Sequence, residues 1–232
     1  MIRLAIADDF TLHREGLRCL LETHPDILVV GEAADGTAAV DLTRKENPDV
    51  LLLETAMPGK DGLDAIKEIV AHGLRSRILA MTMQGTAHLV LRLMRAGAHG
   101  VILRRTCGFK DLLGAIGLVR AGRTYLPPEI RQTFAERYYR TGAGEDPTEQ
   151  LSDREFQVAR FLASGYTNQE IAERLCISIK TVDTHRANIL RKLGLRNNSD
   201  ITRFAICQRL ISCEIPVEDS VSTPEAETSE DF

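Results

Sequence analysis

The stretch DVLLLETAMPGKDG, residues 49–62, decides the fold of the first half of the chain. Its apolar run from Val50 to Leu53 has no polar break, which is typical of a strand that is covered on both faces in a parallel sheet. Glu54 ends the run, and Pro58 and Gly59 mark the turn that follows. The stretch therefore predicts a buried strand with an acidic side chain at its carboxyl end, where α/β sheets bind their ligands.

Similar apolar runs recur along the first 122 residues, and helix-length segments separate them. We predict strands at residues 2–7, 27–33, 50–54, 77–82 and 101–104. Between the last two, Leu89, Val90, Leu93 and Met94 lie three and four residues apart, as on one face of a helix. This alternation predicts an α/β domain over residues 1–122, with a doubly wound, five-stranded parallel sheet.

The composition is that of an ordinary globular protein, with 232 residues, of which 44% are hydrophobic and 27% are charged. This length leaves room for two small domains, and no apolar run reaches the ~18 residues of a membrane-spanning helix. We expect no secretory signal either. The five cysteines are scattered without a Cys-x-x-Cys pair, so we expect a reducing cytoplasm rather than a disulfide framework or a zinc module.

Charge is distributed unevenly along the chain. The first 147 residues have a net charge of zero, residues 148–212 carry a net charge of +3, and residues 213–232 carry a net charge of −7. The acidic end, 213–232, has little apolar content, and we predict a disordered, solubilising tail there. Before the basic segment, Pro127 and Pro128 predict a short helix that reaches about Tyr139, inside a linker over residues 123–149.

Helix-start signals repeat through residues 150–212. Ser152 with Glu155, and Thr167 with Glu170, have the spacing of capping boxes. We predict an all-α domain of four helices at 153–163, 168–175, 179–193 and 200–211. Only three residues separate the second helix from the third, which indicates a helix-turn-helix.

The third of these helices has an apolar stripe and an opposite polar face. Val182, Ile189 and Leu193 form the stripe. Short polar and cationic side chains opposite such a stripe suit a helix that reads the major groove of DNA, although a solvated surface helix has the same pattern. The candidate DNA-binding residues are Lys180, Thr181, Thr184, Ala187, Asn188, Arg191 and Lys192.

Polar side chains also gather where the predicted strands end. Asp8 and Asp9 follow the first strand and Glu54 ends the third, while Thr82 and Arg104 close the fourth and fifth. Hard oxygen ligands grouped in this way suit Mg²⁺, and the hydroxyl and the cation could hold an anion. Ordinary polar turn residues at strand ends are the alternative for any one position.

Residues 2–122 resemble a response-regulator receiver domain, a flavodoxin-like fold. The resemblance rests on residues 7–9, 49–62 and 97–104 and on Thr82. It implies that Asp8, Asp9, the acceptor carboxylate and Ala56 bind Mg²⁺, and that a histidine kinase phosphorylates the acceptor. The chain departs from the family at the acceptor Asp, the lysine of the fifth strand and the switch aromatic, where it has Glu54, Arg104 and Val101.

Residues 151–155, 165–172 and 177–193 resemble the LuxR-type helix-turn-helix. Together with the receiver, the chain is similar to the NarL/FixJ subfamily of response regulators. That resemblance implies a transcription regulator that binds double-stranded promoter DNA as a homodimer at paired half-sites, with a histidine kinase and RNA polymerase as further partners. Asp183 is acidic where many members carry lysine.

The exchange of aspartate for Glu54 has a physical consequence. The extra methylene moves the carboxylate by roughly 1 Å, and phosphoryl transfer depends on in-line positioning to that accuracy. We therefore expect a poor phosphoryl acceptor, with Glu54 paired to Arg104 or sharing Thr82, in a regulator that does not depend on phosphorylation. A decayed site, a conventional phosphorelay regulator and an adaptor that acts through receiver contacts remain alternatives. An enzyme is not expected, because no nucleophile–base set or phosphate-cradling glycine loop is present.

Overall fold

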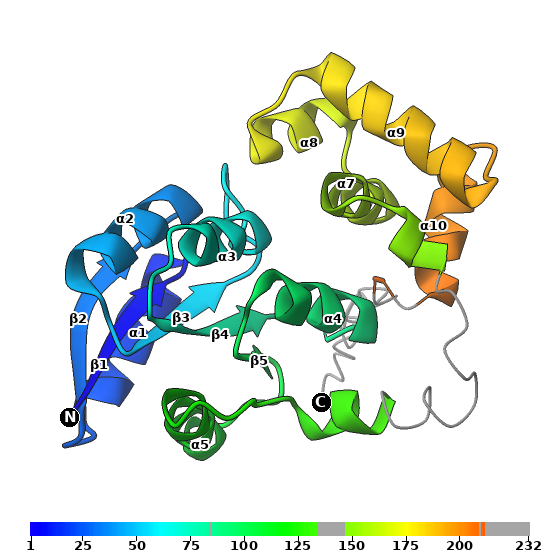
Figure 1. Cartoon of the computed structure of the whole chain (residues 1–232). Coiled ribbons are helices and arrows are strands. Elements are labelled where there is room, and N and C mark those ends of the chain that lie inside the picture. Colours follow the sequence, from blue (N-terminus) through cyan, green and yellow to red (C-terminus); the bar gives the residue numbers. More distant parts are fainter. Residues whose placement is uncertain (84, 134–146, 209, 212–232) are drawn as a thin grey trace, which may run out of the picture.

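The structure, a computed structural model, describes residues 1–83, 85–133, 147–208 and 210–211. The first half forms a five-stranded, fully parallel sheet in the order β2-β1-β3-β4-β5 (Figure 1). The strands are β1 (Ile2–Ala7), β2 (Ile27–Ala33), β3 (Val50–Glu54), β4 (Arg77–Thr82) and β5 (Gly100–Leu103). The helices between and after them are α1 (Thr11–Glu22), α2 (Gly36–Glu46), α3 (Gly62–Ala71), α4 (Ala87–Ala96) and α5 (Phe109–Arg120). The predicted α/β fold is confirmed.

The central strand β3 is buried along its whole length, as its apolar run predicts. Leu51 and Leu53 pack in the cluster that contains α2, α3 and α4. Val50 and Leu52 point to the other face, into the cluster of α1 and α5. Each such side chain contributes about 1.5–3 kcal/mol by leaving water, so the sheet is held from both sides.

The strand order reverses next to β1, which lies between β2 and β3. In parallel α/β sheets, the crevice outside the carboxyl ends of the strands at such a reversal is where ligands bind. Asp8 follows β1 and Glu54 ends β3, so both lie at this crevice. The topology therefore brings together the acidic residues that the sequence singles out.

The second half is helical, with a short 3-10 helix η1 (Pro147–Gln150) and the helices α7 (Asp153–Ala163), α8 (Asn168–Leu175), α9 (Ile179–Leu193) and α10 (Asn198–Cys207). Both predicted capping boxes are present: Glu155 accepts from the Ser152 amide at 2.7 Å, and Glu170 accepts from the Thr167 amide at 2.8 Å. The last helix begins earlier than predicted, because Asn197 accepts from the amide of Asp200 and caps it.

The segment between the two halves is described in part. The backbone is helical at residues 128–133, after the predicted start at Pro127 and Pro128. The rest of that predicted helix, residues 140–146 of the linker and the acidic tail 213–232 lie outside the described residues. Within the described part of the chain, no helix is long and apolar enough to cross a membrane.

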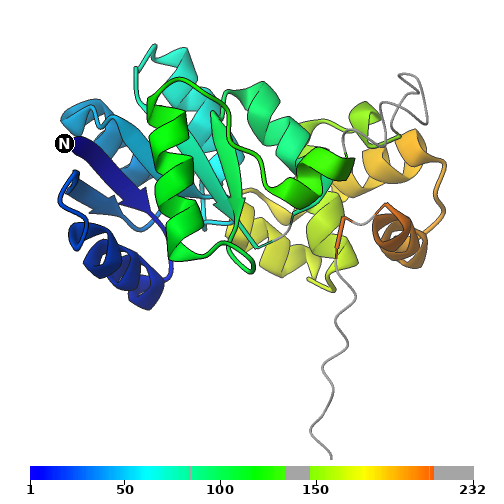
Figure 2. The ribbon, with the colours of Figure 1, turned by 90° about the horizontal axis from the view of Figure 1, so that it is seen from below.

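The α/β domain and the helical domain lie side by side (Figures 1 and 2). One apolar cluster runs across the boundary, from Val90 and Leu93 of α4 to Leu151, which precedes α7, and Phe156 in the first turns of α7. The two domains are therefore packed against each other and not simply tethered.

Candidate functional site

Asp8 lies at the bottom of the acidic crevice and is fully buried. One of its carboxylate oxygens accepts from the amide of Phe10 at 2.8 Å. The other is bonded to His13 Nδ1 in α1. Both oxygens are therefore engaged by the chain itself.

Glu54 is also buried, with 2% of its surface exposed. Its Oε1 accepts from the amides of Thr55 at 2.8 Å and Ala56 at 3.0 Å. Its Oε2 accepts from Arg104 Nη1 at 2.8 Å, so the predicted pairing of Glu54 with Arg104 is confirmed. Burial raises the pKa of Glu54, although the Ala56 amide and Arg104 act in the opposite direction.

Arg104 reaches back into the crevice from just after β5. Its guanidinium lies 3.8 Å from Asp8 Oδ2 and over the ring of Phe10, 5.7 Å from the ring centroid. Its backbone amide donates to the carbonyl of Thr82, so the two residues lie together at the carboxyl ends of the adjacent strands β4 and β5. A planar cation between two buried carboxylates offsets their mutual repulsion.

Val101 and Thr82, the other predicted switch residues, are both buried. Val101 lies in β5 and pairs with Ala80 of β4. It fills core space without the ring that the resemblance leads one to expect there. Thr82 ends β4 beside Met81, at the same sheet edge as Glu54.

The predicted Mg²⁺ ligands do not form a metal centre in this arrangement. Asp8 and Glu54 have all four carboxylate oxygens engaged in hydrogen bonds or ion pairs within the protein. Of the three predicted carboxylate ligands, Asp9 alone keeps a buried oxygen, Oδ1, without a hydrogen-bond partner. Among the residues that the structure describes, no three His, Cys, Asp or Glu side chains are placed to hold a metal. The site as it stands does not fit the ion, because Arg104 supplies the positive charge between the carboxylates.

Helix α9 presents the predicted polar face outward. Val182 and Ile189 are fully buried, as the apolar stripe predicts, and Leu193 is partly buried. Figure 1 shows α9 on the outer side of the helical domain, away from the sheet. The exposed residues of this helix are Ile179, Lys180, Asp183, Thr184, Ala187 and Arg191, and Asn188 is partly exposed beside Arg191.

Two of the predicted DNA-binding residues of α9, Lys192 and Thr181, have partners outside the helix itself. Lys192 pairs with Glu155 of α7 at 2.6 Å, so its ammonium points inward. Thr181 Oγ1 is hydrogen-bonded to Ser178 Oγ at 2.8 Å in the cap of the helix. On a helical wheel, both residues lie near the polar face. Only the structure shows that the ammonium of Lys192 is paired with another helix and that the hydroxyl of Thr181 belongs to the helix cap.

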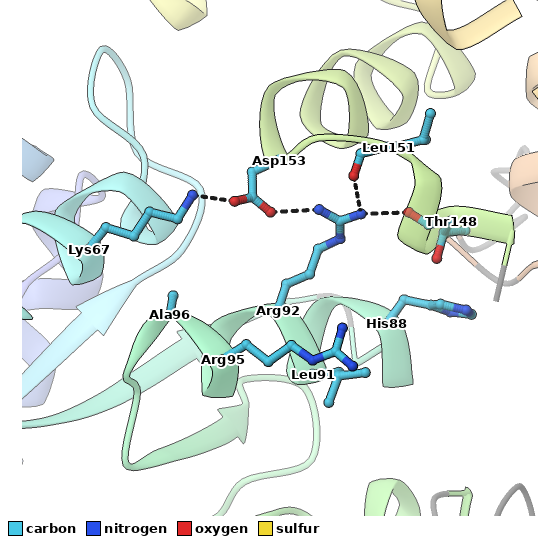
Figure 3. A pocket seen from close by; sticks show the side chains of 9 residues that line it. All are labelled: Lys67, His88, Leu91, Arg92, Arg95, Ala96, Thr148, Leu151 and Asp153. Carbon is cyan, nitrogen blue, oxygen red and sulfur yellow. Dashed lines mark hydrogen bonds and ion pairs between the residues drawn. The ribbon is translucent and has the colours of Figure 1, made fainter. Parts of the chain in front are cut away.

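Contacts between the two domains centre on Arg92 of α4, a residue that sequence reasoning missed. Arg92 donates to Asp153 and to the carbonyls of Thr148 and Leu151, all at 2.6–2.9 Å (Figure 3). Lys67 of α3 pairs with the same Asp153. Arg92 also lies over the ring of Phe156, 4.3 Å from its centroid.

A second group of contacts joins the α3 start to the helical domain. Asp61 caps α3 and accepts from the side-chain amide of Gln157 in α7. Arg154 pairs with Asp64 at 3.1 Å, and the amide of Gly59 donates to the carbonyl of Arg174 at 2.9 Å. Burial raises the pKa of Asp61 to about 6.

An α/β domain with an acidic crevice at the carboxyl ends of its strands, joined to a helix-turn-helix domain, defines a class of protein: a two-domain response regulator. Residues 4–116 match the model of the response regulator receiver domain, and residues 149–205 match that of the bacterial regulatory proteins of the luxR family. The chain belongs to the DNA-binding LuxR-family response regulators of two-component systems. It is 33% identical to the oxygen regulatory protein NreC of Staphylococcus carnosus over 216 residues, which cover 90% of this chain and 99% of that protein. The Staphylococcus aureus NreC is 34% identical over the same coverage.

Solved structures give the same assignment. RcsB from Salmonella enterica serovar Typhimurium, bound to promoter rprA in the presence of phosphomimetic BeF3-, is 29% identical with a TM-score of 0.63, covering 88% of this chain and 97% of that chain. Another Salmonella typhimurium RcsB structure is 27% identical with a TM-score of 0.69, covering 89% of this chain and 98% of that chain. Receiver domains typically bind Mg²⁺ in their acidic pocket, and the Glu54–Arg104 pair is therefore a departure that needs a functional account.

Proposed function

We propose that this protein is a sequence-specific transcription regulator whose receiver is held in one state by the Glu54–Arg104 pair and does not depend on phosphorylation. The observation that carries the proposal is the 2.8 Å bond from Arg104 Nη1 to Glu54 Oε2 inside a buried crevice. A phosphoryl group would bring about −1.5 to −2 charges to this edge, whereas Glu54 brings −1, so any mimicry by Glu54 is partial.

The partners of Glu54 also explain why it is a poor acceptor. One carboxylate oxygen is held by two backbone amides and the other by a guanidinium, so attack on a phosphorus atom requires breaking charge-assisted bonds. The same guanidinium stands in for the cation that a phosphorylated receiver needs. In this proposal Mg²⁺ is not required.

Labelling by acetyl phosphate tests the proposal. We expect wild type to remain unlabelled and to bind promoter DNA without any phosphoryl donor, while Glu54→Asp gains labelling because its carboxylate is a methylene shorter. Glu54→Gln should lower DNA affinity, because it removes the charge that holds Arg104. If wild type is labelled as readily as Glu54→Asp, the protein is a conventional phosphorelay regulator under a histidine kinase, and the proposal is wrong.

We further propose that the outer face of α9 enters the major groove, through Lys180, Thr184, Ala187, Asn188 and Arg191. The exposure of this face in the docked protein supports the assignment. Thr181 and Lys192 are then positioning residues of the helix rather than direct contacts. RcsB is described with promoter DNA and as dimers on DNA. We therefore propose that this protein binds promoter half-sites as a homodimer. It would do so in the cytoplasm, with RNA polymerase as a further partner.

Alanine variants test this face. Lys180→Ala or Arg191→Ala should weaken specific DNA binding by about 1–3 kcal/mol if the contact is to a base edge. Lys110→Ala, which removes an exposed cation from α5 in the other domain, is the matched control and should leave affinity unchanged. Unchanged affinity in both α9 variants would show that this face does not read DNA.

A further inference from the structure

Asp183 is the one acidic residue on the exposed face of α9. It follows Lys180 by three residues and precedes Ala187 by four, so it lies on the same side of the helix as both. On a helix that reads DNA, a carboxylate at this place is repelled by the polyanionic phosphates, which lowers affinity unless the carboxylate makes a compensating contact.

The side chain of Asp183 is held in one orientation by the neighbouring helix. Asn168, the first residue of α8, donates from its side-chain amide to Asp183 Oδ1 at 2.7 Å. No residue that the structure describes donates to the second oxygen, Oδ2, or forms an ion pair with Asp183. The charge is therefore oriented by a neutral donor and left uncompensated.

Base edges in the major groove offer the compensation that phosphates cannot. The exocyclic N4 amine of cytosine is a donor there, and Asp or Glu is the side chain that accepts from it. A guanine or a thymine in place of the cytosine presents acceptors, which a carboxylate repels, and an adenine presents its N6 amine directly beside the N7 acceptor. An oriented carboxylate on a reading helix thus both selects one base and rejects others.

We propose that Asp183 is a specificity-determining residue, which accepts a hydrogen bond from the N4 amine of a cytosine at one position of each half-site, with Asn168 as its positioning residue. This inference rests on the proposed DNA-reading face of α9. The inference predicts that the wild type selects a C·G pair at one position of each half-site. Variants with lysine or alanine in place of Asp183 should not select that pair.

The experiment is selection from DNA with randomised half-sites, carried out with the full chain. Wild type should prefer cytosine at one position by about tenfold or more over thymine. Asp183→Ala should lose that preference while keeping the preference at every other position. Asn168→Ala should weaken the same preference without removing it, because the carboxylate remains but is no longer oriented.

The controls distinguish a failure of this inference from a failure of the proposed DNA-reading face of α9. Glu173→Ala removes an exposed carboxylate from α8 and should leave the whole preference unchanged. If wild type shows no base preference at all, the proposed function fails. If wild type is selective but Asp183→Ala raises affinity equally for every sequence, or if the preference of Asp183→Ala matches that of wild type, Asp183 is not a base reader and only this inference fails.

Discussion

The Glu54–Arg104 pair is a buried ion pair, and its energetics differ from those of a surface salt bridge. Glu54 is 2% and the Arg104 side chain 14% exposed, so both groups have lost most of their hydration. The backbone amides of Thr55 and Ala56 and the ring of Phe10 complete the shell around the two charges. Such a pair adds little net stability, but removal of one partner leaves a buried charge uncompensated.

This asymmetry predicts the effect of Arg104→Ala. We expect the free energy of unfolding in urea to fall by about 3–5 kcal/mol, because the carboxylate of Glu54 stays buried without its partner. The double variant Arg104→Ala with Glu54→Gln should recover part of the loss, since it removes the charge as well. A double variant as unstable as the single one would contradict the pairing as the cause.

Metal binding gives a second prediction at this site. We expect no change in the melting temperature of wild type in millimolar Mg²⁺, because the carboxylate oxygens of Asp8 and Glu54 already have partners. The double variant Glu54→Asp with Arg104→Lys restores the residue types that the receiver family carries and serves as the positive control. Its melting temperature should rise with Mg²⁺, since a ligand that binds only the folded state stabilises it. A rise in wild type would show that Arg104 does not exclude the ion.

The helices and strands themselves follow closely from sequence pattern. The uninterrupted run Val50 to Leu53 predicts β3, and the spacing of Ser152 and Glu155 predicts the first turn of α7. The same reasoning does not reveal the inward turn of Lys192, because its partner Glu155 lies 37 residues away on another helix. The pairing of Glu54 and Arg104, 50 residues apart, was predictable only because the strand order of the fold brings their ends together.

The junction of α3 and α7 carries a pH dependence. Burial raises the pKa of Asp61 to about 6 from an ordinary 3.8, so the folded state binds a proton that the unfolded chain releases. Stability from this group is therefore full below about pH 4 and lost as the pH rises through 6, by at most about 3 kcal/mol. Asp61→Asn keeps a good helix cap and removes the titration. Urea unfolding should show the stability of wild type falling relative to this variant between pH 4 and 6; parallel curves would contradict the shift.

The whole molecule is a docked pair of domains, and the docking depends on charged side chains that no local pattern predicts. Nothing in the sequence distinguishes Arg92, Lys67 and Asp153 from ordinary surface residues of three separate helices. In the structure they converge where α4 and α3 meet the start of α7 (Figure 3). Because this interface uses α7 and the last turn of α8, it leaves the outer face of α9 exposed.

Removal of the central contact tests what the docking does. Arg92→Ala deletes three hydrogen bonds from one guanidinium, and bonds of this charged type contribute about 1.5–3 kcal/mol each. We expect the domains to separate, seen as a larger radius of gyration in X-ray scattering, while Arg44→Ala, which removes an exposed arginine of α2, changes nothing. Since the α9 face is already exposed in the docked form, affinity for a single half-site should change little. The preference for one spacing between paired half-sites should broaden, because a dimer with loosely attached reading helices fits several spacings. A variant that separates yet keeps the sharp spacing preference of wild type would show that the spacing is set by the helical domains alone.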